Sequence, residues 1–170
     1  MNKLNIKKIY TKIFPYLFTI AFLVLSILII RQHELWRDEV HHWNIAASSS
    51  SLSQLFYFMK QDEGHPFLWN IILYFVSHFI SRNIESMKIL HLIFSTSSVF
   101  LILKFSPFNK LIKVLLIFSY FLFFEYSIIS RNYAIEILLI IIFCILYKNK
   151  YKNILSISVV LFLLSSCNIY

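Results

Sequence analysis

Eighteen consecutive residues near the start of the chain, from Ile13 to Ile30, carry no charged side chain. As an α-helix this run would be about 27 Å long, close to the ~30 Å thickness of a bilayer's hydrocarbon core. Four lysines precede the run, and no small-residue cleavage site precedes Arg31, so a cleaved signal peptide is not indicated. We therefore expect an uncleaved membrane span with a cytoplasmic amino terminus, because lysines gather on that side.

The rest of the chain is also too apolar for an ordinary soluble domain. Of its 170 residues, 59% are hydrophobic and only 14% are charged. The net charge of +8 comes from lysines and arginines in short clusters between apolar runs, which membrane topology explains better than nucleic acid does. The composition predicts an integral, multi-pass membrane protein with no nucleic-acid partner.

Five further apolar runs predict helices, because a bilayer offers no water to unpaired backbone groups. The runs are Pro66–Ile80, Ile89–Phe105, Leu111–Phe124, Ala134–Tyr147 and Ile154 to the end. We expect an all-α, polytopic transmembrane helical bundle that forms a single membrane domain over residues 1–170. Its expected parts are a cytoplasmic tail (1–12), a first span (13–30), an extracytoplasmic loop with juxtamembrane helices (31–65) and further helices (66–170).

The lysine clusters conflict with a simple count of crossings. Clusters at residues 104–113 and 148–152 both favour the cytoplasm, yet strict alternation of full spans puts both outside. One short segment that is re-entrant, or that crosses incompletely, would reconcile the charges. The last run stops at Tyr170 without a polar flank, so we also expect the chain to be incomplete at its carboxyl end.

Chemistry-bearing side chains gather in the loop between the first two apolar runs. Residues 31–65 hold five of the eight acids and four of the six histidines. Trp36 and Trp43 are seven residues apart, so we expect them on one helical face at the headgroup level. Ser51-x-x-Gln54 resembles a capping box before a second, amphipathic helix. The loop therefore predicts two helices joined by the serine run 48–51.

Asp38, His41 and His42 have the i, i+3, i+4 spacing that lets three side chains of a helix face one small volume. Three interpretations of Asp38 remain open from these residues alone. It caps a helix amino terminus, it acts as a general base beside apolar walls, or it binds a metal together with a histidine. The spacing matches no known zinc signature.

The loop resembles a known family over two longer stretches. Residues 35–43 (LWRDEVHHW) and 62–69 (DEGHPFLW) are similar to the first lumenal loop of polytopic GT-C glycosyltransferases, which include family 39, the protein mannosyltransferases and the aminoarabinose lipid A transferases. In that superfamily a first span leads to an Asp-Glu pair and then to a His-Pro entry into the second span. Phe67 stands where the family has a second proline. Residues 125–134 (EYSIISRNYA) resemble the family's Ser-Arg-x-Tyr element.

The resemblance implies an enzyme that transfers a sugar, with inversion, from a polyprenyl-phosphate-linked donor to an acceptor outside the cytoplasm. Asp38 would be the general base, and Glu39 would position the acceptor or support Asp38. The implied contacts of the donor phosphate are His65, Arg131 and Tyr133. Further candidate contacts of the acceptor or a metal are His41, His42, Asp62, Glu63 and Glu136.

The partners implied by the resemblance are the lipid-linked donor, the bilayer and an acceptor that is a glycan, a lipid or a protein. Relatives differ in their need for a divalent metal, so Mg or Mn is an allowed cofactor. The implied location is the inner (plasma) membrane of a bacterium. Two rival interpretations stay open: a transporter or channel with Glu125, Arg131 and Glu136 along a polar path, and an inactive, truncated remnant of a transferase.

Overall fold

The computed structural model describes the backbone of residues 3–61 and 67–167, and the side chains from residue 11 onward within these ranges. All regular elements in this part of the chain are helices, which confirms the all-α prediction. They are α1 (Lys3–Ile30), α2 (Arg37–Ser48), α3 (Leu52–Gln61), α4 (Leu68–Phe79), α5 (Glu85–Phe105), α6 (Lys110–Ile117), the π-helix η1 (Tyr120–Glu125), α7 (Tyr133–Tyr147) and α8 (Ile154–Ser165).

The expected single helix over Leu111–Phe124 is wrong, because two helices occupy this run. The backbone of Ser119 is extended, with φ −65° and ψ 156°, and its side chain accepts a hydrogen bond from the backbone nitrogen of Leu122. Ser119 therefore caps η1 after α6 has ended, as serine commonly does at a helix start. The other apolar runs each hold one helix, with ends shifted by a few residues.

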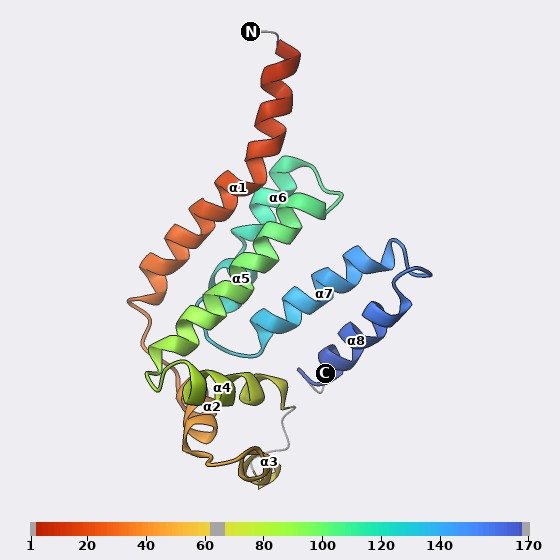
Figure 1. Cartoon of the computed structure of the whole chain (residues 1–170). Coiled ribbons are helices and arrows are strands. Elements are labelled where there is room, and N and C mark those ends of the chain that lie inside the picture. Colours follow the sequence, from red (N-terminus) through yellow and green to blue (C-terminus); the bar gives the residue numbers. More distant parts are fainter. Residues whose placement is uncertain (1–2, 62–66, 168–170) are drawn as a thin grey trace.

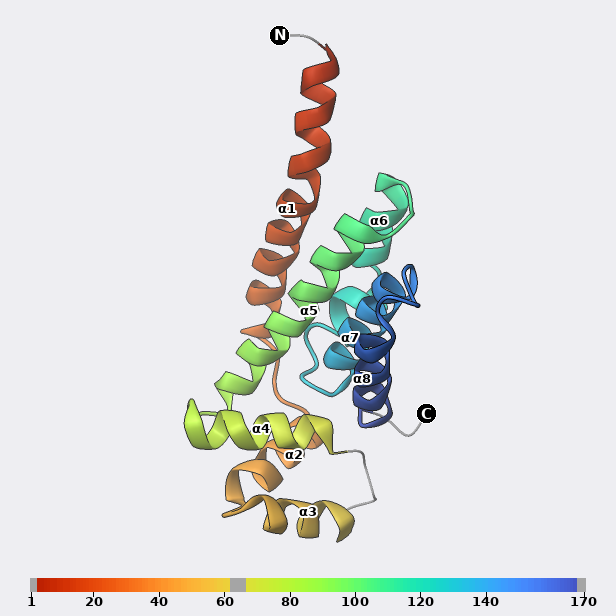
Figure 2. The ribbon, with the colours of Figure 1, turned by 45° about the vertical axis from the view of Figure 1, so that its right-hand side comes forward.

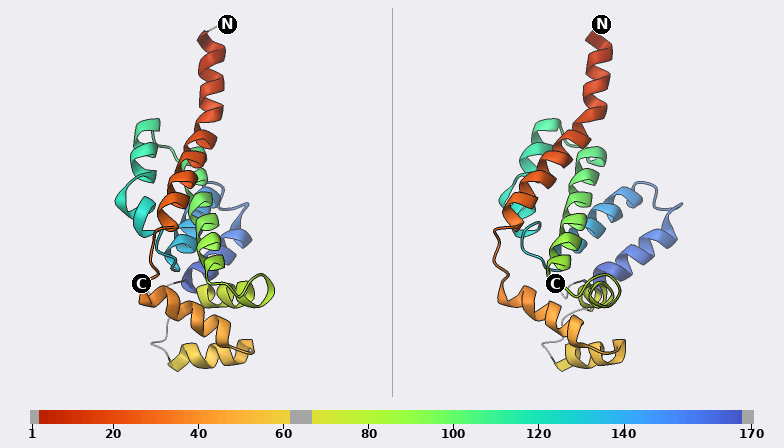
Figure 3. Two further views of the ribbon diagram at one scale, coloured as in Figure 1. Left: turned by 90° about the vertical axis from the view of Figure 1, so that its left-hand side faces the viewer. Right: turned by 60° about the vertical axis from the view of Figure 1, so that its left-hand side comes forward.

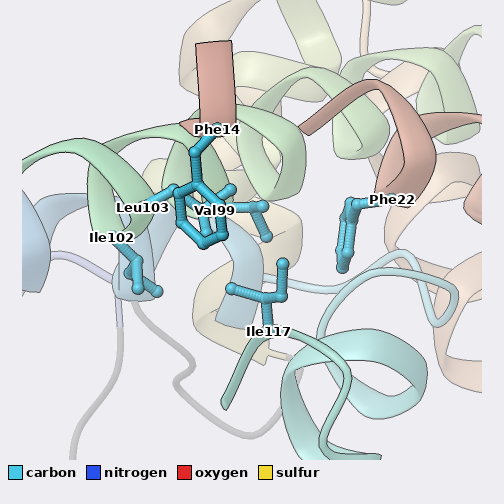
Figure 4. Close-up of a cluster of buried hydrophobic side chains, with 6 residues drawn as sticks. All are labelled: Phe14, Phe22, Val99, Ile102, Leu103 and Ile117. Atoms are coloured by element: carbon cyan, nitrogen blue, oxygen red, sulfur yellow. The ribbon is translucent and has the colours of Figure 1, made fainter. Parts of the chain in front are cut away.

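Helices α1 and α5 lie side by side and form the main packing unit with α6 (Figure 1). Their shared core holds buried side chains from all three helices, shown in Figure 4: Phe14, Phe22, Val99, Ile102, Leu103 and Ile117. Phe22 is fully buried, and its ring lies 5.5 Å from that of Phe123 in η1. Helices α7 and α8 form a hairpin beside α5 (Figure 1).

Helix α4 does not run along the bundle but lies across its end, next to α2 and α3 (Figures 1 and 2). This end, made of α2, α3, α4 and residues 126–132, is called the loop end below. Trp43 and Trp69 pack in its buried cluster with Met87. The expectation that Trp36 and Trp43 share a face is wrong: Trp36 precedes α2 and is 49% exposed, whereas Trp43 is 4% exposed.

The two loop helices were predicted correctly. Helices α2 and α3 are separated by the serine run, and the backbone nitrogen of Gln54 donates to Ser51 Oγ over 3.2 Å. The Gln54 side chain accepts from the backbone nitrogen of Ser50 over 2.7 Å. This reciprocal pair satisfies two amide groups that a helix start leaves without partners.

Because α4 lies across the end, α5 and α7 both run away from the loop end, toward the end where α1 begins (Figures 1 and 2). The elements at that far end carry the lysine clusters, and together they are called the basic end: Lys12, Lys104, Lys110, Lys113, Lys148, Lys150 and Lys152. Both lysine clusters therefore lie at the same end of the bundle, opposite to α4.

Two helices in the described part of the chain are long and apolar enough to span a membrane. They are residues 11–30 of α1 and all of α5, with mean hydropathies of 2.6 and 1.6. Helices α4, α7 and α8 are apolar but shorter. Length and composition thus support association with a membrane.

Candidate functional site

Glu39 is the centre of a buried hydrogen-bond network at the loop end. Its side chain is fully buried, and its Oε2 lies 2.8 Å from the backbone nitrogen of Trp36 and 2.8 Å from His33 Nε2. Its Oε1 accepts a hydrogen bond of 2.6 Å from the backbone nitrogen of Ser130, which is 91 residues away in sequence. An ionised carboxylate only accepts, so His33 donates through Nε2. Glu39 thus fastens the start of α2 to the segment before α7.

This fastening brings Asp38 and Arg131 together. Asp38 Oδ2 lies 3.5 Å from an Arg131 guanidinium nitrogen, and the two side chains are 56% and 24% exposed. The guanidinium carbon is 5.2 Å from the centre of the Tyr133 ring, a distance at which a cation interacts favourably with an aromatic face. Figure 3 shows how α2 lies at the same end of the molecule as the connection into α7.

The pair combines two groups with different chemical capacities. Asp38 is a half-exposed carboxylate that an incoming hydroxyl group can reach, and carboxylates accept protons in this setting. Arg131 offers a planar fork of N–H groups that suits phosphate oxygens. Its Nε is buried and has no hydrogen-bond partner within the described ranges. The arrangement can therefore bind an oxyanion beside a proton acceptor.

Two buried residues of α5, Lys88 and His91, pack against elements of this end of the molecule. Lys88 Nζ donates to the backbone oxygen of His33 over 3.4 Å and pairs with Glu85 over 3.0 Å. His91 is fully buried, and its ring lies 6.3 Å from that of Trp69. Helix α5 thus contacts the turn before α2 through Lys88 and α4 through His91.

The three side chains expected to face one volume have different partners. Asp38 pairs with Arg131, whereas His42 Nδ1 lies 3.0 Å from Asn70 Oδ1 on α4. The ring of His41 is 6.1 Å from that of His42, and His41 is exposed. Helix α2 begins at Arg37 with Trp36 as its N-cap, so Asp38 is the second helical residue and not the cap. His42 therefore faces α4.

The remaining candidates do not join the pair in the described structure. Asp62, Glu63 and His65 lie outside the described residues. Glu136 is near Cys167, and burial, with the charge of Glu136 as the smaller cause, raises the pKa of that thiol to about 11. The Cys167 thiol therefore stays protonated at neutral pH. Glu125 accepts a hydrogen bond of 3.3 Å from the Tyr120 hydroxyl.

The two acids that the structure places at this site, Glu39 and Asp38, already have other partners. Within residues 3–61 and 67–167, no group of three His, Cys, Asp or Glu side chains is arranged to hold an ion. Both oxygens of Glu39 already accept hydrogen bonds, and Asp38 is paired with an arginine. Mg or Mn as a cofactor stays a prediction, because the candidate contacts Asp62, Glu63 and His65 lie outside the described residues.

Sequence reasoning missed His33, Lys88, His91 and Ser130. Lys88, His91, Ser95 and Ser98 are all buried and follow a helical spacing along an otherwise apolar helix, which is a signal for an inward polar face. His33 and Ser130 had no such signal. Ser130 contributes only its backbone nitrogen, and His33 lies in the irregular turn between α1 and α2.

The chain was also compared with known proteins. No family model, no curated protein and no solved structure matches it. The functional argument therefore rests on the motifs described above and on the geometry of their residues.

Proposed function

We propose that this chain is a multi-pass membrane glycosyltransferase of the GT-C type, which transfers a sugar from a polyprenyl-phosphate donor to an acceptor outside the cytoplasm. One observation carries the proposal. Two motifs that resemble separate elements of that superfamily meet at 3.5 Å through Asp38 and Arg131, although 92 positions separate them. If Asp38 only capped a helix and Arg131 only anchored a helix at the membrane surface, the two side chains would not need to lie close to each other.

In the proposed reaction the acceptor hydroxyl oxygen attacks the anomeric carbon of the donor sugar. Its proton passes to the Asp38 carboxylate, and the bond between the anomeric carbon and the phosphate oxygen breaks on the opposite face. Arg131 stabilises the negative charge that develops on the departing polyprenyl phosphate. Tyr133 holds the guanidinium plane through its ring. A donor phosphate that binds Arg131 replaces Asp38 as its partner, which frees the carboxylate to accept a proton.

Glu39 has a positioning role in this proposal and is not a catalytic residue. It is fully buried, so no acceptor reaches it, but it fixes both the start of α2 and the backbone next to Arg131. His65, outside the described residues, remains a proposed contact of the donor phosphate. The membrane placement in this proposal has the basic end in the cytoplasm and the loop end outside, which agrees with the side on which lysines gather.

The test is a transfer assay in membranes that contain the full-length protein, with radiolabelled lipid-linked sugars as donors. Asp38→Asn keeps the size and polarity of the side chain but removes its basicity, so transfer should fall by about 10²- to 10⁴-fold. Glu34→Gln is the matched control, because Glu34 is an exposed acid of the same loop. Equal transfer by Asp38→Asn and the wild type, at equal expression, would contradict the proposal.

A further inference from the structure

A groove of about 580 Å³ runs between α1 and α5, on the surface of the two helices that are long and apolar enough to span a membrane. Its walls are mostly apolar side chains from both helices. Ile89 and Ile93 of α5 are 61% and 56% exposed, so the groove is open to whatever surrounds the helices. In a membrane that surrounding is lipid.

The charged residues of the groove all lie at one end of it. Arg31 follows the last residue of α1, and Glu85 and Lys88 lie in the first turns of α5, so this is the end nearest the loop helices. Glu85 and Lys88 neutralise each other at 3.0 Å. Arg31 is exposed and makes no ion pair with any described residue. The groove is therefore mostly apolar, apart from the hydroxyl groups of Thr96 and Ser97, with one positive charge, unpaired among the described residues, at its end.

The volume of the groove is in the range of one hydrocarbon chain. If a methylene group takes up about as much space as a water molecule, ~30 Å³, the same groove takes about 19 of them. That number is in the range of one lipid acyl chain.

We propose that the α1–α5 groove binds one anionic phospholipid of the surrounding bilayer, with an acyl chain along the apolar walls and its phosphate at Arg31 and Lys88. The phosphate forms a charge-assisted contact with Arg31 and competes with Glu85 for the ammonium group of Lys88. This inference rests on the membrane placement in the proposed function, but it does not depend on glycosyl transfer.

Lys88 joins this lipid site to the candidate active site. It donates to the backbone oxygen of His33, and the ring of His33 donates to Glu39. A phosphate that binds Lys88 therefore also restrains His33, which contacts Glu39, the residue next to Asp38. The bound phospholipid is expected to steady the turn between α1 and α2.

The experiment reconstitutes the full-length protein in vesicles of phosphatidylcholine and phosphatidylglycerol, with a photoreactive acyl chain on one lipid at a time and no sugar donor. Crosslinks from phosphatidylglycerol should map to the groove, around Ile89 and Ile93. Arg31→Gln should lower their yield by about tenfold, the size expected for a lost charge-assisted contact. Arg82→Gln, an exposed arginine beside the start of α5 that does not line the groove, should leave the yield unchanged.

A second variant tests the acyl chain. Ile93→Trp fills the groove at an exposed position, where folding tolerates a larger side chain, and should abolish the groove crosslinks. Three results would overturn the inference: equal groove yields from phosphatidylcholine and phosphatidylglycerol, unchanged labelling in Arg31→Gln, or crosslinks to a second protein chain. Competition by unlabelled polyprenyl phosphate but not by unlabelled phosphatidylglycerol would also overturn it, because the groove would then belong to the donor.

Discussion

The two ends of the bundle use their polar side chains in different ways. At the loop end, side chains connect distant parts of the chain: Glu39 reaches Ser130 across 91 residues and Lys88 reaches His33 across 55. At the basic end, Lys104 and Lys150 lie over aromatic rings of neighbouring residues, 5.2 to 5.3 Å from their centres. The side-chain contacts of the loop end therefore join distant segments, whereas these lysines of the basic end contact rings close to them in sequence.

The charged side chains of the two ends also differ in their burial. Glu39 and Lys88 are buried and paired, which is the condition under which buried charges are tolerated. Lys148, Lys150 and Lys152 are exposed. The basic end also has one buried charge, Lys113, whose ammonium group donates to the backbone oxygen of Leu103 within the same end.

The strongest test of the difference between the two ends is whether they lie on opposite sides of the membrane. In a background with Cys144 and Cys167 replaced by alanine, Ser50→Cys should react with a membrane-impermeant maleimide in intact cells. Lys150→Cys should react only after the membrane is opened, because lysine clusters stay in the cytoplasm. Labelling of both positions from the same side would contradict the assignment of the ends.

The next largest effect concerns Arg131. Arg131→Gln should lower transfer by about 10²- to 10³-fold, since one donor that stabilises developing charge is typically worth that much. Arg131→Lys keeps the charge but not the planar fork and should retain part of the activity. Arg37→Gln, an exposed arginine on α2, is the matched control in the same radiolabel assay. Full activity in Arg131→Gln would remove Arg131 from the site.

A smaller effect is expected for Glu39→Gln, which tests the network and not the chemistry. Glutamine offers one accepting oxygen in place of two, so one of the three N–H groups around Glu39 loses its partner at a cost of about 1–3 kcal/mol. Limited proteolysis should then cut residues 31–36 faster, and transfer should fall less than in Asp38→Asn. Glu125→Gln, at a half-exposed acid of η1, is the control. An unchanged cleavage rate would show that the network does not hold this turn.

The smallest effect belongs to the basic end. Lys113 Nζ donates to the backbone oxygen of Leu103 over 2.8 Å, which satisfies one of the carbonyl groups that the end of α5 leaves unpaired. Lys113→Met should lower the free energy of unfolding in detergent by about 0.5–1.5 kcal/mol and leave transfer unchanged. A large loss of transfer in this variant would mean that the two ends are not independent.

Much of the fold was predictable from apolar periodicity and breakers. The runs around α1, α4, α5, α7 and α8 were located, and the serine run correctly separated α2 from α3. The interruption at Ser119 was missed, because a single serine inside an apolar run is compatible with a continuous helix. The orientation of α4 could not be derived from its own composition, since the same apolar stretch suits a span or a helix packed across the bundle end.

The candidate site was only partly predictable. Asp38, Glu39, Arg131 and Tyr133 were named from their resemblance to family motifs, and the structure brings these four together. The different burial of Asp38 and Glu39 was not predictable, because both lie in the first turn of α2. It depends on how that turn is rotated toward Ser130, which is a property of the tertiary structure.

The most direct test of the central claim, that Asp38 and Arg131 form a reaction site and not merely a structural ion pair, is a charge swap. In the native protein the two opposite charges lie 3.5 Å apart. The double variant Asp38→Arg with Arg131→Asp keeps one positive and one negative side chain at these two positions but exchanges which position carries which charge. Transfer and thermal unfolding should be measured for this variant and for both single changes. We predict that the swap recovers thermal stability lost in the singles while transfer stays absent. Recovery of transfer together with stability would contradict the claim.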